Sequence, residues 1–462
     1  MMSSAIIKEL KSIVGPKNVL SGKEECLDYG YDGTLTEYSA DAVVFVTSTE
    51  EVVQIVKLAN KHLVPIVARG AGTNLSGGTV PYKGGIIINM TRMKRLLEID
   101  IQNNLAVVEP GLVNFDLQEM LAPYGYYYSP DPASMKATTI GGNVGENAGG
   151  PRCLKYGVTR EYIRGLEVVL PTGEVVMVGG KNKFTNDGFD LTKLMVASEG
   201  ILGIFTKIIV TITPIGEAKK TMLCSYDKIE DASNTVADIV GAGIVPTTLE
   251  FMDNLLINCA EDHTKVGLPR DAAAVLLIEI DGYKEDLPGQ VETIHGVCKK
   301  NNVREFKVAQ SAAEVDQLWL ARRTVIGAVA RKRPSYSLQD VTVPRNKMPI
   351  IVSSIVDISK KYNLPIGILA HAGDGNLHPL VLFDERDKDE VERVHEAEGE
   401  ICKVALSLGG TLSGEHGIGI LKLPYLGLEF SEETIAKMKG IKKLFDPNNI
   451  LNPGKAVGGV DL

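Results

Sequence analysis

The sequence lacks the cysteine patterns that mark thiolate metal sites. Its 462 residues include six cysteines, at positions 26, 153, 224, 259, 298 and 402, and no two of them have CxxC spacing. Iron–sulfur clusters and thiolate-bound zinc are therefore not expected. A disulfide framework is not expected either, since such frameworks belong to short secreted chains.

Long hydrophobic runs and an excess of basic residues are absent as well. No run approaches the roughly 20 apolar residues that cross a bilayer, and the N-terminal residues 1–15 hold no apolar block long enough for a signal peptide. The formal net charge is −9, which argues against a nucleic-acid partner because such partners select a basic face. We expect a cytoplasmic protein without a transmembrane segment.

The composition is that of an ordinary globular protein, with 44% hydrophobic and 23% charged residues. The length suggests two or three domains. Glycine becomes less frequent after about residue 216, and helical and strand patterns then alternate to about residue 410. We therefore expect a first domain at 1–215, a second at 216–410, and a C-terminal segment at 411–462 that returns to the first domain.

Two short strands flank a glycine-rich segment in the first domain. A helix is expected at 48–62, because Ser48 and Glu51 form a capping-box pattern and apolar residues recur on one face. Strands follow at 65–68 and 85–89. The segment 69–78 between them lets backbone N–H groups approach an anion closely.

This segment does not match the two familiar phosphate-binding motifs. The Rossmann fingerprint opens a helix, whereas a strand follows here, and the Lys-Ser/Thr pair of a Walker loop is missing. A nucleotide site at 69–78 would therefore be a strand–loop–strand cradle. A turn without any ligand is the alternative.

A second glycine-rich segment lies at 138–150, with five glycines in thirteen positions. A glycine-rich segment of this kind loses much conformational entropy when it is ordered, and a large flat ligand lying against it would make that ordering easier to explain. Asp131, between two prolines, gives a stiff turn just before, and 198–204 form another turn that enters a strand.

Two short motifs contain three of the seven histidines. Residues 371–378, HAGDGNLH, predict a hairpin with its loop at 373–376, which places His371 directly opposite His378. Opposed side chains have Cβ atoms about 4.5–5.5 Å apart, so the two imidazoles could bind one metal ion. A cross-strand pair without a ligand is the alternative.

The second motif, SGEHGIG at 413–419, places glycines on both sides of Glu415 and His416. Glu415 could complete a metal site of two histidines and one carboxylate. His416 suits a general base, because the unperturbed pKa of histidine lies near neutrality. Alternatively, Glu415 accepts hydrogen bonds from loop amides and His416 is exposed.

The order of the motifs carries a resemblance to a known family. PxxxRGxGT at 65–73, PDP at 130–132, TIGGNxxxNAGG at 139–150 and SEGxLGI at 198–204 follow one another. In this order they resemble the FAD-binding domain of flavoproteins of the vanillyl-alcohol-oxidase and p-cresol-methylhydroxylase type. The similarity is greatest to the branch that contains D-lactate and D-2-hydroxyglutarate dehydrogenases and the FAD-binding subunit of glycolate oxidase. It extends to the tail, DPNNILNPGK at 446–455.

The resemblance implies an α+β fold with a two-part FAD-binding domain, an antiparallel-sheet α+β cap domain for the substrate, and a C-terminal segment that returns to the FAD domain. It also implies non-covalent FAD, because no histidine occurs between residues 70 and 78. The residues expected to bind FAD are Arg69, Gly70, Ala71, Gly72, Thr73, Asn74, Gly77, Gly78, Pro130, Asp131, Thr138, Gly141, Gly142, Asn143, Gly145, Asn147, Gly149, Glu199, Gly200, Gly203, Ile204 and Asn452.

The same resemblance assigns roles to the histidine motifs. It makes His371, His378 and Glu415 the ligands of one divalent metal ion (Zn, Fe or Mn) and His416 the catalytic base. The segment 318–323 resembles the family's WxxR segment, which points to Arg322 as the clamp for the substrate carboxylate. A solvated basic face is the alternative for this arginine.

Three apolar residues bear on the substrate. Ile326, approximately Leu338, and Leu380, two residues after His378, stand where relatives that take a dicarboxylate offer polar groups. We therefore expect D-lactate to be oxidised to pyruvate by hydride transfer to flavin N5, with His416 taking the hydroxyl proton.

Other functions stay open at this point. The chain could be a glycolate or D-2-hydroxyglutarate dehydrogenase subunit, a flavoenzyme acting on an alcohol, sugar or phenol, a non-catalytic FAD-binding subunit of a larger redox complex, or a metallohydrolase. For a dehydrogenase, the electrons are expected to leave to a redox protein, either an electron-transferring flavoprotein or an iron–sulfur subunit.

Overall fold

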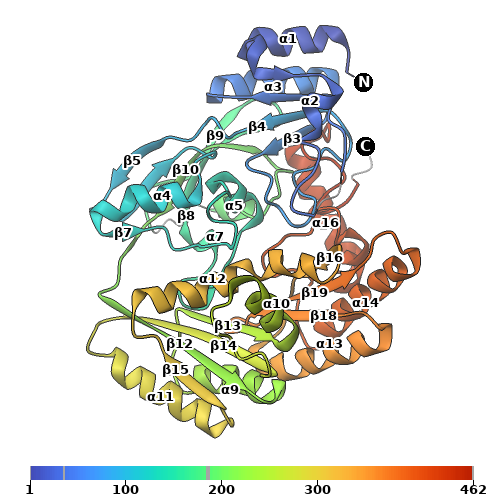
Figure 1. The fold of residues 1–462 in the computed structure, drawn as a ribbon. Coiled ribbons are helices and arrows are strands. Elements are labelled where there is room, and N and C mark those ends of the chain that lie inside the picture. The colour runs from blue at the N-terminus through green and yellow to red at the C-terminus, as the bar shows by residue number, and fades with distance from the viewer. Residues whose placement is uncertain (1, 35–36, 184–187, 460–462) are drawn as a thin grey trace. The chain divides into compact units, whose positions relative to one another are not determined.

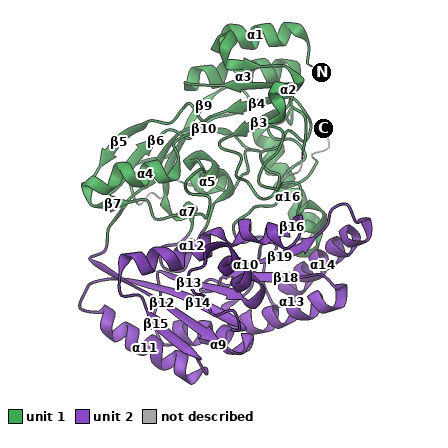
Figure 2. Ribbon diagram, viewed as in Figure 1, with its two compact units in different colours: residues 1–149, 158–215, 415–462 green, residues 150–157, 216–414 purple. Residues whose placement is uncertain are grey.

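The computed structural model describes residues 2–34, 37–183 and 188–459 (Figure 1). The chain divides into two compact units (Figure 2). Unit 1 comprises Met1–Gly149, Val158–Ile215 and Glu415–Leu462, and unit 2 comprises Gly150–Gly157 and Gly216–Gly414. Among the described residues, no helix combines the length and the apolar character needed to cross a bilayer.

The first sheet of unit 1 is built around three parallel strands. Its order is β1 (Val19–Leu20), β2 (Ala42–Phe45), β4 (Ile86–Asn89) and β3 (Ile66–Arg69), with β4 parallel to both β2 and β3. All four residues of β4 are buried. The chain leaves β3 through segment 69–78 and returns in β4, so the predicted strand–loop–strand arrangement is confirmed.

The helix predicted at 48–62 is confirmed as α3 (Thr49–His62). Ser48 is its N-cap, and its hydroxyl accepts a hydrogen bond from the Glu51 amide at 3.2 Å. The Glu51 carboxylate accepts from the Thr47 amide at 2.6 Å. The cap therefore satisfies amides that a helix start leaves without partners.

The second sheet of unit 1 is antiparallel. Its order is β5 (Leu96–Asp100), β6 (Leu105–Val108), β10 (Ile204–Thr211), β8 (Ile163–Val169) and β9 (Val175–Gly179). The two sheets form the two parts of the expected FAD-binding domain. Besides helix α5 (Ile140–Glu146) and short 3-10 helices, unit 1 also contains α1 (Ser4–Val14), α2 (Lys23–Leu27), α4 (Asn114–Leu121), β7 (Tyr126–Tyr127), α7 (Thr159–Tyr162), α8 (Leu191–Met195), β11 (Thr213–Pro214), α15 (Leu426–Glu429) and α16 (Glu432–Phe445).

The sequence predicts a loop in the second glycine-rich segment, 138–150, but the structure shows that it is only partly a loop. Its central part forms helix α5 (Ile140–Glu146), capped by Thr139, whose hydroxyl accepts from the Gly142 amide at 3.3 Å. Close packing explains one of its glycines, because a Cβ on Gly141 would lie 2.6 Å from the Cβ of Pro110. The entropy lost by these glycines is therefore offset partly by contacts within the protein.

The C-terminal segment returns to unit 1, as expected. The Ile66 amide donates to the Ile450 carbonyl and the Asn452 amide donates to the Ile66 carbonyl, both at 2.7 Å. Leu451 forms a parallel bridge with Ile66, so the tail continues the sheet edge at β3.

Unit 2 is built on one antiparallel sheet. Its order is β15 (Glu305–Val308), β12 (Ala218–Tyr226), β14 (Ala274–Gly282), β13 (Thr248–Asp253), β18 (Ile366–His371), β19 (Asn376–Phe383) and β16 (Ser335–Leu338), and β17 (Val341–Thr342) also pairs with β19. Its helices are α6 (Cys153–Tyr156), α9 (Ile229–Gly241), α10 (Asn254–Thr264), α11 (Leu287–Lys300), α12 (Ala312–Ala328), α13 (Met348–Tyr362) and α14 (Lys388–Ser407). This is the predicted antiparallel α+β cap domain.

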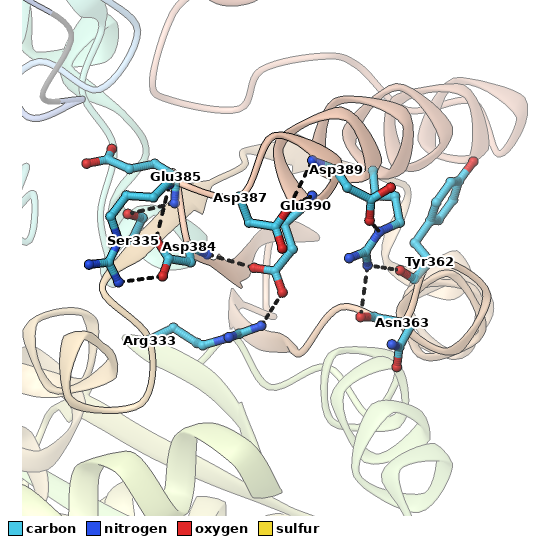
Figure 3. A network of polar contacts seen from close by, with 11 residues as sticks. Arg333, Ser335, Tyr362, Asn363, Asp384, Glu385, Asp387, Asp389 and Glu390 are labelled. Atoms are coloured by element: carbon cyan, nitrogen blue, oxygen red, sulfur yellow. Dashed lines mark hydrogen bonds and ion pairs between the residues drawn. The ribbon is translucent and has the colours of Figure 1, made fainter.

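A polar network fixes the start of α14 (Figure 3). The Asp387 carboxylate accepts from the Asp389 amide at 3.0 Å and from the Glu390 amide at 3.3 Å. The Glu390 carboxylate accepts from the Asp384 amide at 2.7 Å and pairs with Arg333. The network joins the end of β19 to the first turn of α14 and thereby holds the outer part of the sheet.

Candidate cofactor and active sites

Unit 1 contains a cavity with an empty volume of about 560 Å³, including its open mouth. Most of its wall comes from residues 68–79, helix α5 and residues 199–205, which overlap the three segments singled out in the sequence at 69–78, 138–150 and 198–204. Among the residues expected to bind FAD, the cavity is lined by Arg69, Gly70, Gly78, Gly141, Gly142, Gly145, Glu199, Gly200, Gly203 and Ile204. The other lining residues were not among those expected to bind FAD, and they are Ala68, Thr79, Met90, Pro110, Thr139, Glu146 and Phe205.

The wall of this cavity has the shape of a cradle. A Cβ built on Gly145 would meet no heavy atom within 4 Å, and one on Gly200 would meet only Asn452 Nδ2, at 3.8 Å. Side chains at these two positions would therefore enter the space that the cavity leaves. Such a surface fits a large planar cofactor that lies against the backbone.

Several other residues expected to bind FAD instead support the wall. The side-chain Oδ1 of Asn74 accepts from the backbone amides of Ser76 at 2.9 Å and Gly78 at 2.6 Å, which folds the glycine-rich loop. Asn452 donates to the carbonyls of Gly78 at 2.8 Å and Glu199 at 2.7 Å. The expected residues that do not line the cavity are Ala71, Gly72, Thr73, Asn74, Gly77, Pro130, Asp131, Thr138, Asn143, Asn147, Gly149 and Asn452.

Ionisable groups are buried at the cavity. Burial raises the pKa of Glu146 well above its usual value, and the charge of Glu199 raises it further. Lys455 donates to the Gly78 carbonyl at 2.8 Å, and burial lowers its pKa to about 7. Sequence reasoning missed Glu146 and Lys455, although they lie inside the motifs at 139–150 and 446–455, because only the folded chain shows that their charges are buried.

Glu199 anchors the segment that carries His416. Its carboxylate accepts from the amides of Ile418 at 2.9 Å and Gly419 at 2.6 Å. The Ser76 carbonyl in the glycine-rich loop accepts from the Ile420 amide at 2.9 Å. His416 is buried, so the exposed position considered from the sequence is wrong. Within unit 1, the histidine-bearing segment is thus fixed to the wall of the cavity.

In unit 2, the predicted hairpin forms with a shifted register. His371 pairs with Asn376, and His378 pairs with Leu369, whereas the sequence predicted that the two histidines oppose each other. The turn begins one residue earlier than predicted and closes at Gly375, which has a φ of 81°. The pairing moves by two residues, so both histidines stay on one face of the sheet.

The two imidazoles are diagonal neighbours on that face. Their ring centroids lie 5.0 Å apart with an interplanar angle of 84°. Each ring has a nitrogen within 4.8 Å of a nitrogen of the other. An ion held at about 2.1 Å from each of two nitrogens needs them roughly 3–4 Å apart. After a small adjustment of either ring, the two nitrogens are close enough to hold one divalent metal ion between them.

A buried carboxylate that the sequence did not reveal contacts this pair. Glu250, on β13, is 1% exposed, and its Oε1 lies 2.8 Å from Nδ1 of His371. Its Oε2 accepts from Nε of Arg322 at 2.6 Å and lies 2.5 Å from Nη2. A glutamate within the apolar strand 248–253 was the available signal. Arg322 thus forms a buried ion pair, and a solvated basic face is excluded for it.

Burial and charge act in opposite directions on Glu250. Burial alone would raise its pKa, but the charges of Arg322 and His371 and their hydrogen bonds outweigh it, so the pKa lies below its usual value. Arg322 and Glu250 also line a small cavity with an empty volume of about 270 Å³ whose remaining wall is apolar. An apolar wall strengthens the pair because it keeps water away.

Asp340 is a second buried carboxylate beside the histidine pair. Its Oδ1 lies 3.9 Å from Nδ1 of His378. Its Oδ2 accepts from the Ser413 hydroxyl at 2.6 Å and from the Gly414 amide at 2.9 Å. A Cβ on Gly414 would lie 2.4 Å from the Thr342 hydroxyl oxygen, so only glycine fits there. Asp340 therefore fixes, within unit 2, the residue that precedes Glu415 in the chain.

The three apolar positions linked to substrate size belong to the core of unit 2. Leu380 is fully buried, and Ile326 and Leu338 pack against the same cluster, which includes Met252 and Leu256. None of the three offers a polar group.

Family models match both halves of the chain. One described as FAD linked oxidases, C-terminal domain, matches residues 215–456, and one described as FAD binding domain matches residues 40–179.

Two curated relatives match over nearly their whole length. The glycolate oxidase subunit GlcD of Bacillus subtilis (strain 168) is 46% identical over 456 residues, which cover 98% of this chain and 97% of the relative. The D-lactate dehydrogenase of Anaerostipes hadrus is 34% identical over 460 residues, covering 97% and 96%.

Solved structures share the fold. Substrate-bound p-cresol methylhydroxylase aligns with a TM-score of 0.82 at 17% identity, covering 99% of this chain and 98% of that one. The 4-ethylphenol oxidase of Gulosibacter chungangensis aligns with a TM-score of 0.80 at 19% identity, covering 99% and 97%.

Proposed function

Because this chain belongs to the family of FAD-linked oxidases, we propose that it is an FAD-dependent dehydrogenase of small 2-hydroxy acids. The family matches confirm the resemblance read from the motif order and support FAD as the cofactor. The observation that carries the proposal lies in unit 1, where Glu199 lines the cavity and also holds the segment that bears His416.

In this proposal the protein holds the substrate in position and provides a proton acceptor. FAD, when bound, supplies the two-electron acceptor for the hydride from the substrate carbon. An imidazole nitrogen of His416 accepts the proton of the substrate hydroxyl. Glu199 keeps His416 in place, because the two amides that it accepts from are only two and three residues further along the chain.

We propose that His371, His378 and Glu415 hold one divalent metal ion, which would polarise the substrate hydroxyl as a Lewis acid. The fit of the two imidazoles supports the first two ligands. Covalent geometry supports the third: Gly414 is fixed on Asp340, and the next Cα along the chain is about 3.8 Å away. The identity of the ion among Zn, Fe and Mn belongs to the same proposal.

Arg322 is proposed to hold the substrate carboxylate. A guanidinium has five N–H donors, and the contacts with Glu250 use two of them. The apolar Ile326, Leu338 and Leu380 favour a substrate without a second carboxylate. D-lactate is the substrate expected from the sequence, and glycolate stands beside it because relatives are named glycolate oxidase subunits.

Electrons from the reduced cofactor are proposed to pass to a redox protein, either an electron-transferring flavoprotein or an iron–sulfur subunit. The word subunit in the relatives' name supports such an assembly. The cytoplasmic location expected from the sequence is part of this proposal.

The test is anaerobic reduction of the bound flavin by D-lactate, L-lactate and glycolate, followed by visible absorbance. We expect His416→Gln to slow reduction by about 10²- to 10⁴-fold while the flavin stays bound. His62→Gln, on the exposed end of α3, is the control and should behave as wild type. Wild-type reduction rates in His416→Gln, or no reduction of the wild type by any of the three acids, would refute the proposal.

A further inference from the structure

The Glu250 carboxylate in unit 2 is divided between two partners. One oxygen contacts His371 at 2.8 Å, and the other contacts two nitrogens of Arg322, at 2.6 and 2.5 Å. We infer that Glu250 is a positioning residue that sets the ring tautomer of His371 and the direction of the Arg322 guanidinium together. This inference rests on the proposed function, in which these two residues hold the metal ion and the substrate carboxylate.

The tautomer follows from the chemistry of the contact. An ionised carboxylate can only accept a hydrogen bond, so the nitrogen that faces it must carry the proton. In a neutral His371 ring, Nδ1 is then the N–H, and Nε2 carries the lone pair that a metal ion needs. Without Glu250, Nδ1 loses the carboxylate that favours its proton. Part of the population would then carry the proton on Nε2, where it blocks metal binding.

The surroundings keep Glu250 ionised and in one orientation. Glu250, Arg322 and His371 are 1%, 4% and 5% exposed. The neighbouring cavity wall is apolar, so little water competes with the contacts. A buried carboxylate is stable in its charged form only when it is paired and hydrogen-bonded, and Arg322 meets both needs. The guanidinium is fixed in return, because its planar fork binds one oxygen through two nitrogens.

Glu279 provides an internal comparison. It is 3% exposed and lies on β14, on the same face of the sheet. Like Glu250 it is capped from α12, since Nε1 of Trp319 donates to it at 3.3 Å, and the Thr221 hydroxyl donates at 2.8 Å. Its described contacts include no histidine. Substitution of Glu279 therefore removes a buried carboxylate that is bound from α12 without removing a contact of His371 or Arg322.

The first experiment reads the tautomer directly. The FAD-loaded protein is labelled with ¹⁵N-histidine and freed of metal by a chelator, and the His371 nitrogens are observed by NMR among the seven histidines. We expect Nδ1 to carry the proton in wild type and in Glu279→Gln. The double variant Glu250→Leu/Arg322→Leu, which leaves no unpaired buried charge, should shift the population toward Nε2–H. A wild-type ring protonated on Nε2, or a double variant identical to wild type, would overturn the inference.

The second experiment measures Zn²⁺ affinity by competition with a coloured chelator. We expect Glu250→Gln to bind Zn²⁺ about 10- to 100-fold more weakly than wild type, and Glu279→Gln to bind as wild type does. Equal losses in both variants would show a general effect of the fold and overturn the inference, as would unchanged affinity in Glu250→Gln. If wild type itself binds no Zn²⁺, the proposed metal site fails, while the NMR result still decides the role of Glu250.

Discussion

Gly145 offers the sharpest test of the cofactor cavity, because one substitution should change folding and cofactor binding in opposite directions. The residue lies in the last turn of α5 and lines the cavity. A Cβ at this position would meet no heavy atom of the protein within 4 Å. Gly145→Ala is therefore not expected to strain the protein itself.

The two effects can be estimated separately. Replacing a helical glycine by alanine removes conformational freedom from the unfolded chain and should raise the free energy of unfolding of the FAD-free protein by about 0.5–1 kcal/mol. A methyl group that enters a filled binding surface costs about 1–3 kcal/mol, which weakens FAD binding by about 5- to 150-fold. Gly145→Leu should weaken binding further.

The measurements are urea unfolding of the FAD-free protein and titration of that protein with FAD, followed by flavin fluorescence. Gly440→Ala is the matched control, because Gly440 lies in helix α16 of the same unit and its Cβ would also meet nothing within 4 Å, but it does not line the cavity. It should show the gain in stability and no change in FAD affinity.

Unchanged FAD affinity in both Gly145→Ala and Gly145→Leu would refute the assignment of this cavity. A loss of stability in Gly145→Ala that matched its loss of FAD affinity would also refute the reasoning, because it would show that the new side chain disturbs the protein and not the ligand.

Three further substitutions test the forces in the fold. Gly141→Ala would bring its Cβ to 2.6 Å from that of Pro110, so we expect urea unfolding to show a loss of about 1–3 kcal/mol; a gain would contradict the packing argument. Lys442→Met leaves the buried Asp446 without its ion-pair partner and should cost about 3–5 kcal/mol in the same assay, whereas a loss below about 1 kcal/mol would show that the pair is unimportant. Burial raises the pKa of Asp253 from 3.8 to about 7, so the folded protein binds a proton that the unfolded chain releases. Stability should therefore fall by up to about 4 kcal/mol as the pH rises from about 4 to about 7. Asp253→Asn should reduce this fall in a pH series of unfolding experiments, and an unchanged slope would refute it.

Local patterns in the sequence were sufficient for much of the fold. The cap and the apolar face of α3 depend on residues that lie within one or two turns of each other, so they can be read without tertiary contacts. The strand–loop–strand arrangement around 69–78 and the hairpin at 371–378 are local in the same sense. The predicted register of the hairpin was wrong by two residues. The turn closes at Gly375, which adopts a positive φ, and the next residue, Asn376, pairs with Thr342 on another strand; the local sequence pattern shows neither feature.

Contacts between distant segments could not be read in this way. Glu199 meets amides more than 200 residues away, and Glu250 meets a histidine 121 residues away. Helix α5 was not expected because glycine normally destabilises a helix. Close packing against Pro110 nevertheless makes glycine necessary at position 141 of this helix.

The chemical groups of the protein, their order and most of its short helices and strands follow from neighbouring residues, so they can be read along the chain. Which carboxylates are buried, which amides and ring nitrogens they face, and which glycines close packing requires became visible only in the folded protein. Burial and hydrogen-bond geometry arise between segments far apart in the chain, where the folded backbone sets the distance.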